Sequence, residues 1–339
     1  MTLRQAQGER ATLGVVGAGA WGTALAQMLS GGGRAVLLWA REPEVVAAIN
    51  AERRNPLFLP SAELSPELRA TRELAEMAEL DCILVVTPAQ HVGATLTALR
   101  PRDGCDLVLC AKGIEAGSGR MMAEVARAAA PGCPLAVLSG PTFAHEVAAG
   151  LPTAVTLACG EGEGQWARLA PAIARPAFRP YYSDDVIGAE IGGAVKNVLA
   201  IACGVVDGLG LGQNARAALI SRGFAEMLRF GLALGARAET LSGLSGLGDL
   251  VLTCSSTASR NYALGKALGE GASARDALAG RNDVAEGAHT APVLARLAAD
   301  RGIDMPIVAA VCALLTAAAP PREIVAGLLA RPLRAEQRA

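Results

Sequence analysis

Lysine is scarce in this chain, and one of its lysines stands in an unusually apolar stretch. Only three of the 31 basic residues are lysines, namely Lys112, Lys196 and Lys266. Lys196 lies within GGAVKNVLAIACGVV, which carries no other charged side chain. Because lysine, unlike arginine, can give up its proton when it is desolvated, Lys196 is a candidate proton donor or acceptor. Alternatively, Lys196 lies at a helix edge with its stem on apolar surface and its ammonium in water.

Two further segments place polar groups where a predicted strand ends. Ala111-Lys112-Gly113 follows one such strand, and ligands bind at the carboxyl ends of strands in an open α/β sheet. This position favours a ligand or phosphate contact for Lys112 over a surface charge. In SGPTFA (139–144), Gly140 offers a close backbone approach and Thr142 offers a hydroxyl. Alternatively, the segment is only a turn, with Thr142 as the N-cap of the next helix.

The second half of the chain contains a third polar segment, GLGDL (246–250), followed by SRN (259–261). Asp249 either caps the helix after it or holds Lys196 and tunes its proton affinity. Arg260, flanked by Ser259 and Asn261 at a helix start, suits a phosphate. It would supply a planar fork of donors beside a hydroxyl and the free N–H groups of the helix end.

These groups together favour hydride transfer from a nicotinamide to a carbonyl on a small phosphorylated substrate. Hydride attack builds negative charge on the carbonyl oxygen, which a nearby ammonium can stabilise and protonate. The three histidines, at positions 91, 145 and 289, are dispersed along the chain. Lys196 is therefore the best candidate for the acid.

A glycine-rich turn near the amino end predicts a dinucleotide site. Gly17, Gly19 and Gly22 form the pattern GAGAWG directly after an apolar strand and at the start of a helix. The three glycines would give a tight turn, room for a pyrophosphate and close packing of helix on strand. Trp21, in the variable position, would flank the nicotinamide or pack as a core aromatic. Alternatively, the turn binds no ligand.

The end of the second strand bears on which dinucleotide would bind. An acidic residue that grips the adenosine ribose is expected about 20 residues after the glycines. The sequence there is Trp39-Ala40-Arg41-Glu42. Arg41 could attract a 2′-phosphate and Glu42 could accept a ribose hydroxyl, or the two could simply pair in water. Arg41 favours NADPH over NADH.

Alternating hydrophobic patterns predict the elements that would position these residues. Short apolar runs predict strands at 12–17, 35–39, 81–87, 106–111, 134–139, 153–158 and 178–183. Helical patterns lie between them, for example at 21–30, 43–52, 71–79, 89–99 and 119–130. This alternation predicts a Rossmann-type α/β domain with a parallel sheet over residues 1–187. From there on the periodicity is helical only, at about 211–235, 259–269, 286–301 and 306–318, which predicts an all-α domain over residues 188–339.

Composition narrows the class of protein. The net charge is −1 with no basic block, so a nucleic-acid partner is not expected. Residues 1–10 resemble no signal or transit peptide, and the longest uninterrupted apolar runs fall short of the ~20 residues of a membrane span. Eight cysteines are scattered without a Cys-x-x-Cys pair, which favours core residues in a reducing compartment over disulfides or a metal site. We therefore expect a cytoplasmic enzyme without a metal.

Six segments, in this order and at this spacing, carry a resemblance to a known family. They are GAGAWGTALA, AKG, SGPTFA, GGAVKN, GLGDL and SRN. The chain resembles the bacterial NAD(P)-dependent glycerol-3-phosphate dehydrogenases over nearly its whole length. The resemblance implies reversible reduction of dihydroxyacetone phosphate to sn-glycerol 3-phosphate, with NADPH or NADH, for glycerophospholipid synthesis. It is also compatible with a homodimer.

The resemblance implies roles for individual residues of this chain. Lys196 would be the proton donor and acceptor, with Asp249 beside it in the catalytic centre. The implied substrate contacts are Lys112, Gly140, Thr142, Lys196, Asp249, Ser259, Arg260 and Asn261. Beyond the glycines of the turn, the implied cofactor contacts are Ala20, Trp21, Arg41, Lys112, Ala144, Arg260, Val284 and Glu286. The chain departs from the family pattern at Ala20, where serine is frequent, and at His145, where lysine or arginine is common.

Two other functions remain open at this point. A β-hydroxyacid dehydrogenase of the 6-phosphogluconate type also combines a dinucleotide fold with a helical domain that bears a catalytic lysine. Such an enzyme would be expected to have Ser-Gly-Gly where this chain has Ser139-Gly140-Pro141. A non-catalytic nucleotide-binding regulator would make the polar groups around Lys196 coincidental, and turnover would distinguish it from either enzyme.

Overall fold

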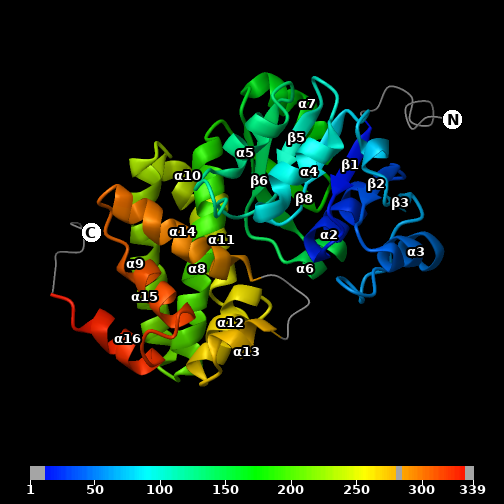
Figure 1. Cartoon of the computed structure of the whole chain (residues 1–339). Coiled ribbons are helices and arrows are strands. Elements are labelled where there is room, and N and C mark those ends of the chain that lie inside the picture. The colour runs from blue at the N-terminus through cyan, green and yellow to red at the C-terminus, as the bar shows by residue number, and fades with distance from the viewer. Residues whose placement is uncertain (1–11, 280–284, 333–339) are drawn as a thin grey trace. The chain divides into compact units, whose positions relative to one another are not determined.

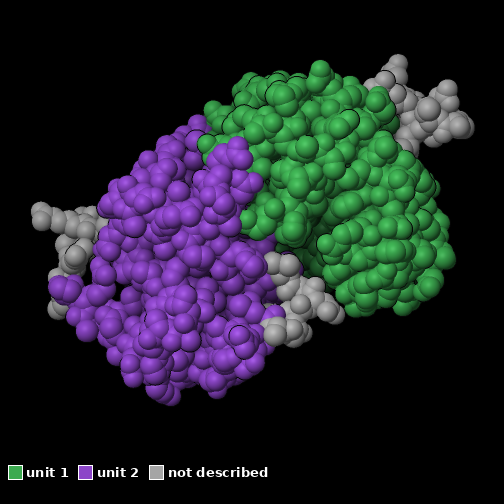
Figure 2. Space-filling model, in the orientation of Figure 1, with its two compact units in different colours: residues 1–111, 122–186 green, residues 112–121, 187–339 purple. Residues whose placement is uncertain are grey.

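The computed structural model describes residues 12–279 and 285–332. The chain divides into two compact units, which Figure 2 shows in different colours. Unit 1 comprises residues 1–111 and 122–186, and unit 2 comprises residues 112–121 and 187–339. The short segment 112–121, which begins with Lys112, therefore packs with the second half of the chain although it lies between two segments of unit 1.

Unit 1 is built on an eight-stranded sheet with the order β3-β2-β1-β4-β5-β6-β7-β8 (Figure 1). The strands are β1 (Leu13–Val16), β2 (Val36–Trp39), β3 (Leu68–Thr71), β4 (Cys82–Val85), β5 (Asp106–Leu109), β6 (Leu135–Ser139), β7 (Thr153–Cys159) and β8 (Phe178–Ser183). The strands from β1 to β6 run parallel, with Val16 opposite both Trp39 and Val85. Their apolar side chains are buried, as expected for a sheet that is covered on both faces.

The sheet is not wholly parallel, which corrects the expectation from sequence. β7 pairs antiparallel with β6, and β8 pairs parallel with β7. The only helix between β6 and β7 is α6 (Ala144–Ala148), whose five residues extend about 7.5 Å. The five-residue strand β6 extends about 16 Å, so α6 does not carry the chain back to the amino end of the sheet.

The connections of unit 1 form two helical layers. The helices are α2 (Ala20–Leu29), α3 (Pro43–Glu52), α4 (Val92–Leu99), α5 (Met122–Ala129), α6 and α7 (Glu163–Ile173), with 3-10 turns η1 (Leu74–Met77) and η2 (Ala89–His91). α2 packs beside α6, and α4 packs beside α5. The connection from β1 leads to β2 on one side, and that from β4 leads to β5 on the other side. Crossovers in opposite directions along a parallel sheet place their helices on opposite faces of the sheet. The strand β3 was not expected from sequence, and the helix expected at 71–79 is only the turn η1.

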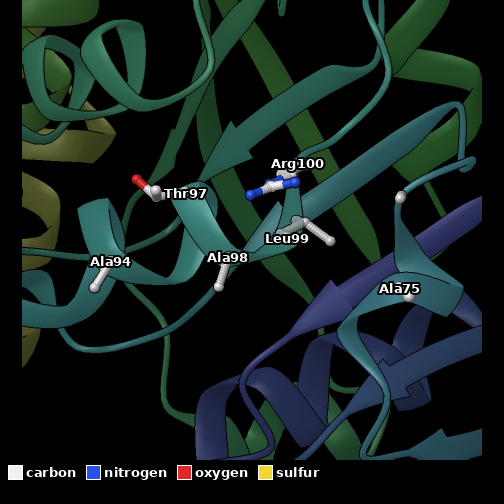
Figure 3. Close-up of a pocket in the computed structure, with 7 residues that line it drawn as sticks. Ala75, Ala94, Thr97, Ala98, Leu99 and Arg100 are labelled. Carbon is white, nitrogen blue, oxygen red and sulfur yellow. The ribbon is translucent and has the colours of Figure 1, made fainter.

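A shallow hollow of unit 1 lies away from the edge where ligands are expected. Its volume is about 720 Å³, and it is lined by residues of η1 and α4 and by the residues that directly follow them, as Figure 3 shows. Arg100 in its wall directly follows α4 and leads toward β5, so the hollow lies at the amino ends of the strands. Its lining consists mainly of alanine side chains. It therefore offers few polar groups to a ligand.

The described part of unit 2 from residue 187 on is helical, as expected, whereas its segment 112–121 contains no helix. Its helices are α8 (Val186–Gly208), α9 (Gly212–Ala233), α10 (Ala238–Ser242), the π-helical turn η3 (Leu244–Gly248), α11 (Asp249–Thr253), α12 (Arg260–Gly269), α13 (Ala274–Ala279), α14 (Glu286–Asp300), α15 (Pro306–Leu315) and α16 (Pro321–Leu329). One of them, α8, is long and apolar enough to span a membrane by length and composition. However, 94% of its apolar window is buried inside the structure, so α8 is the central core helix of unit 2.

Glycines allow α8 and α12 to pack backbone against backbone. A Cβ on Gly265 would lie 1.9 Å from the carbonyl oxygen of Ile201, and one on Gly204 would lie 2.1 Å from that of Tyr262. Gly208 and Gly269 repeat this close approach one helical turn further along. A larger residue at these positions would separate the helices. The glycine pairs therefore bring the start of α12, where SRN lies, beside the middle of α8.

Candidate active site

The carboxylate of Asp249 lies between two ammonium groups. Lys196 Nζ donates to Asp249 Oδ1 at 2.6 Å, and Lys112 Nζ donates to Asp249 Oδ2 at 2.6 Å. Lys196 Nζ also donates to Thr253 Oγ1 at 2.9 Å. The side chain of Asp249 is fully buried, and those of Lys196 and Lys112 are 7% and 14% exposed. Unit 2 therefore contains two ammonium groups that share one buried carboxylate.

The backbone around Asp249 explains how a carboxylate reaches the core helix. η3 is a π-helical turn, a form that is rare and frequent at functional sites. A Cβ on Gly192 of α8 would lie 2.3 Å from the carbonyl oxygen of Ser245, so η3 packs directly on the α8 backbone. Lys196 follows Gly192 by four residues and thus projects from the same face of α8. Asp249, directly after η3, meets it there and does not cap its helix through its side chain.

The surroundings of Lys196 lower its affinity for protons. Burial lowers the pKa of Lys196 from 10.5 to about 8, because the charged ammonium loses its hydration. The Asp249 carboxylate opposes this effect, and the adjacent Lys112 ammonium adds to it. Lys196 is therefore poised to exchange a proton near neutral pH, which a lysine in water cannot do efficiently. The snorkelling alternative is wrong, since the ammonium itself is buried.

A chain of side-chain amides connects the two lysines to the start of α14. Asn197 Nδ2 donates to the carbonyl oxygen of Lys112 at 3.3 Å, and Asn261 Nδ2 donates to Asn197 Oδ1 at 3.0 Å. The backbone N–H of Gly287 donates to Asn261 Oδ1 at 3.0 Å. Both asparagines are buried. The side-chain amide of Asn261, a residue expected to contact substrate, is thus engaged within unit 2.

The other two residues of SRN occupy the start of α12. Ser259 is the N-cap, and its Oγ accepts a hydrogen bond from the backbone N–H of Tyr262 at 3.3 Å. Arg260 is the first residue of the helix and is exposed. An exposed guanidinium at the positive end of a helix dipole is a suitable arrangement for binding a phosphate.

In unit 1, the glycine-rich turn has the shape that a pyrophosphate needs. Gly17 has φ +113°, and its N–H donates to the carbonyl oxygen of Trp39 at 3.1 Å. A Cβ on Gly22 would lie 1.8 Å from the carbonyl oxygen of Gly17, so only glycine lets α2 start this close to β1. Gly19 is the N-cap of α2 without a side-chain cap, and the space where its Cβ would stand is open. The first N–H groups of α2, which begins at Ala20, can therefore serve an anion.

Two observations show that these residues fit a dinucleotide. Asn55, which is fully buried, donates from Nδ2 to the carbonyl oxygen of Ala18 at 2.9 Å and to Thr23 Oγ1 at 2.8 Å. These bonds fix the turn without using the N–H groups at the start of α2. In addition, Trp21 Nε1 is buried and has no hydrogen-bond partner in the described structure. A bound ligand would supply one.

At the end of β2, Arg41 and Glu42 form an ion pair. Arg41 Nη2 lies 2.8 Å from Glu42 Oε1, and the Arg41 side chain is 80% exposed. This is the arrangement that the sequence left as an alternative to cofactor contacts. The pair leaves the preference between NADPH and NADH unresolved, since either partner could turn toward a ribose.

Gly140, Thr142 and Ala144 follow the end of β6 in unit 1. Gly140 has φ +154°, and its Cβ would lie 2.9 Å from the Cα of Val155 on β7. Thr142 Oγ1 donates to the carbonyl oxygen of Gly140 at 3.3 Å, and Phe143, not Thr142, is the N-cap of α6. The segment is thus a tight turn at the carboxyl edge of the sheet. His145 stacks on Phe143 with 5.8 Å between ring centroids.

The remaining predicted cofactor contacts lie near the start of α14. Glu286 is the first residue of that helix and is partly buried. Val284 lies outside the described residues. Two further candidates escaped the sequence analysis, Thr253 and Asn197. Thr253 stands four residues after Asp249, and this i, i+4 spacing could have revealed it. Asn197 directly follows Lys196, but nothing in its position predicts that its amide would reach Lys112.

Two family models, one for each half of the same family of proteins, together match most of the chain. The model described as NAD-dependent glycerol-3-phosphate dehydrogenase N-terminus matches residues 12–164, and that described as the C-terminus matches residues 185–326. The chain is 74% identical to the glycerol-3-phosphate dehydrogenase [NAD(P)+] of Novosphingobium aromaticivorans over 324 residues, which cover 96% of this chain and 98% of the relative. It is 68% identical to the protein of the same name from Erythrobacter litoralis, with 96% of this chain and 98% of the relative covered.

The fold is similar to that of a solved structure of the same kind. The crystal structure of glycerol-3-phosphate dehydrogenase from Coxiella burnetii matches with a TM-score of 0.90 and 39% identity. The match covers 95% of this chain and 99% of that chain. Both compact units therefore have counterparts in a protein of known structure.

Proposed function

Because the chain belongs to the NAD-dependent glycerol-3-phosphate dehydrogenase family, we propose that it reduces dihydroxyacetone phosphate reversibly to sn-glycerol 3-phosphate with Lys196 as general acid and base. The observation that carries this proposal is the buried Lys196 ammonium, held by Asp249 within the residues that the C-terminal family model matches. The chain is an oxidoreductase acting on a CH–OH group, and it uses NAD or NADP. In the cell its product would feed glycerophospholipid synthesis.

Lys196 performs the proton transfer in this mechanism. A bound nicotinamide cofactor supplies the hydride. Two N–H donors of Lys196 are engaged by Asp249 and Thr253, and the third donates to the carbonyl oxygen of the substrate. As negative charge develops on that oxygen, the ammonium stabilises it and then transfers its proton. In the reverse direction the neutral amine removes the proton from the hydroxyl.

Asp249 and Lys112 set the charge around Lys196. The carboxylate keeps enough positive charge on Lys196 for it to act as an acid, despite burial. Lys112 counteracts this by lowering the pKa of Lys196, so that the ammonium releases its proton near neutral pH. Asp249 contacts the Lys196 ammonium but does not itself donate or accept the transferred proton.

Binding residues are assigned on the family resemblance together with the local geometry. Arg260 at the start of α12 binds the substrate phosphate, and Ser259 holds that helix end. The resemblance also assigns substrate contacts to Gly140 and Thr142. The dinucleotide binds on the turn Gly17–Gly22. The resemblance assigns it further contacts with Arg41, Lys112, Ala144, Arg260, Val284 and Glu286.

Oxidation of NADPH and NADH in parallel, with dihydroxyacetone phosphate as sole acceptor, tests the proposal. We expect rapid oxidation with at least one cofactor, and faster oxidation with NADPH if Arg41 contacts a 2′-phosphate. An Arg41→Ala variant should then lose this advantage, with KM for NADPH raised several-fold and KM for NADH unchanged. No oxidation by folded protein that binds NADPH would contradict the proposed substrate, and hydroxy acids would be screened next.

The substrate phosphate has a separate test. Arg260→Ala should mainly raise KM for dihydroxyacetone phosphate, because the fork of charged donors is lost while Lys196 stays in place. An unchanged KM would mean that the phosphate is held elsewhere. Residues 1–187 and 188–339 are proposed as the cofactor and substrate domains, apart from the segment 112–121 that packs in unit 2.

Assembly and location are proposed from the resemblance alone. We expect a cytoplasmic homodimer. Sedimentation at micromolar protein concentration measures the mass directly, and a species of 34.5 kDa would contradict the dimer.

A further inference from the structure

A threonine that no sequence motif or comparison singles out stands beside the dinucleotide turn. Thr87 follows β4 by two residues and is 5% exposed. Its backbone nitrogen lies 3.0 Å from the point where a Cβ on Gly17 would stand, so the peptide of Val86 and Thr87 packs directly on the glycine turn. β1 and β4 are neighbours in the sheet and lead into crossovers on opposite sides. Thr87 therefore lies at the switch point, where open α/β sheets bind their ligands.

The hydroxyl of Thr87 has no hydrogen-bond partner in the described structure, although it is buried. Leaving a buried hydroxyl unpaired disfavours the folded state, and valine would fill the same volume without that cost. Two other buried threonines of unit 1 are paired through their hydroxyls. Thr12 Oγ1 donates to Asp81 at 2.9 Å, and Thr23 Oγ1 donates to the carbonyl oxygen of Ala18 at 3.1 Å. Among the described residues, Thr87 is the one threonine whose fully buried hydroxyl lacks a partner, and this exception calls for a ligand.

Two of the other unpaired groups, in Trp21 and Ser139, lie at the same edge of the sheet. Buried side-chain atoms without partners in the described residues are Trp21 Nε1, Thr87 Oγ1, Ser139 Oγ, Arg175 Nε and Arg229 Nη1. The two arginines bond through their other guanidinium nitrogens. Trp21 lies on α2, which follows β1, whereas Thr87 follows the carboxyl end of β4 and Ser139 ends β6. Three unmet polar groups along one sheet edge match an elongated polar ligand.

We infer that the Thr87 hydroxyl is a hydrogen-bond ligand for the nicotinamide half of the dinucleotide. The inference rests on the dinucleotide site proposed above. The phosphates belong at the start of α2, and the adenosine half belongs toward the end of β2, where Arg41 lies. β4 is the neighbour of β1 on the other side, so Thr87 meets the opposite half of the molecule. Its partner is a ribose hydroxyl or the carboxamide, which can both donate and accept.

The test compares Thr87→Val and Thr87→Ser with the wild-type enzyme. Calorimetry would measure Kd for NADH, NADPH and ADP, and thermal unfolding would be followed without ligand. We expect Thr87→Val to weaken NADH and NADPH about 5- to 15-fold, the usual effect of one hydrogen bond. ADP, which lacks the nicotinamide half, should bind within twofold of wild type. Thr87→Ser keeps the hydroxyl and should keep both affinities.

The unfolding temperature separates a ligand role from a structural one. If the Thr87 hydroxyl bonds only to a ligand, the ligand-free Thr87→Val protein unfolds at the same temperature as wild type or at a higher one. Thr97→Val is the matched control, since Thr97 Oγ1 is exposed and bonds to the carbonyl oxygen of Gly93 in α4. That control should bind every nucleotide as wild type does.

Three results would overturn the inference. They are unchanged Kd values for NADH and NADPH in Thr87→Val, a parallel loss of ADP binding, and weak binding in Thr87→Ser. Should valine prevent folding, Thr87→Ala removes the same hydroxyl without adding bulk and takes its place. Wild-type enzyme that binds neither NADH nor NADPH would instead refute the proposed dinucleotide site itself.

Discussion

Two buried carboxylates of unit 2, those of Asp249 and Glu226, are stabilised in different ways. Asp249 is fully buried between the ammonium groups of Lys112 and Lys196. Glu226 on α9 is 1% exposed, and its oxygens accept the backbone N–H groups of Ile307 and Val308 at 2.7 and 3.2 Å. Those N–H groups belong to the first turn of α15. Asp249 therefore interacts with groups that can exchange protons, whereas Glu226 interacts with a helix end that cannot.

This difference separates a carboxylate that tunes chemistry from one that holds structure. Burial raises the pKa of Glu226 to about 7, and its bonds to Ile307 and Val308 reduce the shift only in part. Arg229 also lowers this pKa, and Asp304 raises it. The charge of Asp249 is matched by neighbouring charges, while that of Glu226 is matched mainly by two backbone N–H dipoles, with a smaller contribution from Arg229. Substitutions at the two sites should therefore affect different properties.

Replacing Lys196 should have the largest effect on turnover. Lys196→Met removes the ammonium and keeps an apolar stem of similar length, and we expect kcat to fall by ~10²–10⁴, the range for losing a general acid. Cofactor affinity should stay near normal. Lys196→Arg should also fail, because arginine keeps the charge but cannot release the proton. Substantial turnover by the arginine variant would indicate that Lys196 acts only through its charge.

Neutralising Asp249 should have the second largest effect. Asp249→Asn removes the charge that supports protonation of Lys196, so the pKa of Lys196 should fall below about 8. We expect kcat for reduction to decrease on the order of 10- to 100-fold, less than on losing the acid itself. The matched control is Glu226→Gln, which neutralises a buried carboxylate that does not contact Lys196. If both variants lost activity equally, the distinction between the two sites would fail.

The pH dependence should follow the lowered pKa of Lys196. Reduction needs the protonated ammonium, so its rate should fall about tenfold per pH unit above a pKa of about 8. Oxidation needs the neutral amine, so its rate should rise with pH up to that pKa and then level off. Steady-state rates in both directions between pH 6 and 10 would measure this. Two profiles with the same direction would contradict a single acid and base.

The smallest effect concerns stability rather than catalysis. The folded pKa of Glu226, about 7, lies above its ordinary value of 4.5, so the folded state retains a proton that the unfolded state has already lost. The contribution of Glu226 is therefore fully present below pH 4.5 and is lost as the pH rises to about 7. Glu226→Gln should remove that part of the pH dependence, about 3 kcal/mol at most, since one pKa unit corresponds to about 1.4 kcal/mol. Denaturant unfolding at pH 5 and pH 8 measures it, and an unchanged dependence would contradict the assignment.

Hydrophobic periodicity predicted the elements that are long and strongly patterned. The expected helix 43–52 is α3, and 259–269 matches α12 to one residue. The strand β3 was missed because its four residues include the charged Arg69 and show no extended apolar run. The direction of β7 could not be predicted, since an alternating pattern is the same for either direction of a strand.

The sequence predicted the charged residues of the candidate site better than the contacts of its amide side chains, for a physical reason. Lys196 and Asp249 stand out by being charged in apolar segments, and the structure brings them together across 53 residues of sequence. The engagement of Asn261 with Asn197 and Gly287 depends on the glycine-mediated approach of α8 and α12, which no local pattern encodes. The roles of these residues in catalysis stay predictions until the variants are measured.

The placement of segment 112–121 in unit 2 has a consequence for dividing the protein. The chain passes between the two units three times, at 111/112, 121/122 and 186/187. A fragment that begins at residue 187 would lack Ile114 and Met121 from its core, and Asp249 would lose the Lys112 ammonium. Its missing piece is a short contiguous peptide. The enzyme thus offers a system for fragment complementation, in which a peptide of residues 112–121, added to the truncated helical unit, would restore a charge partner and two core side chains together.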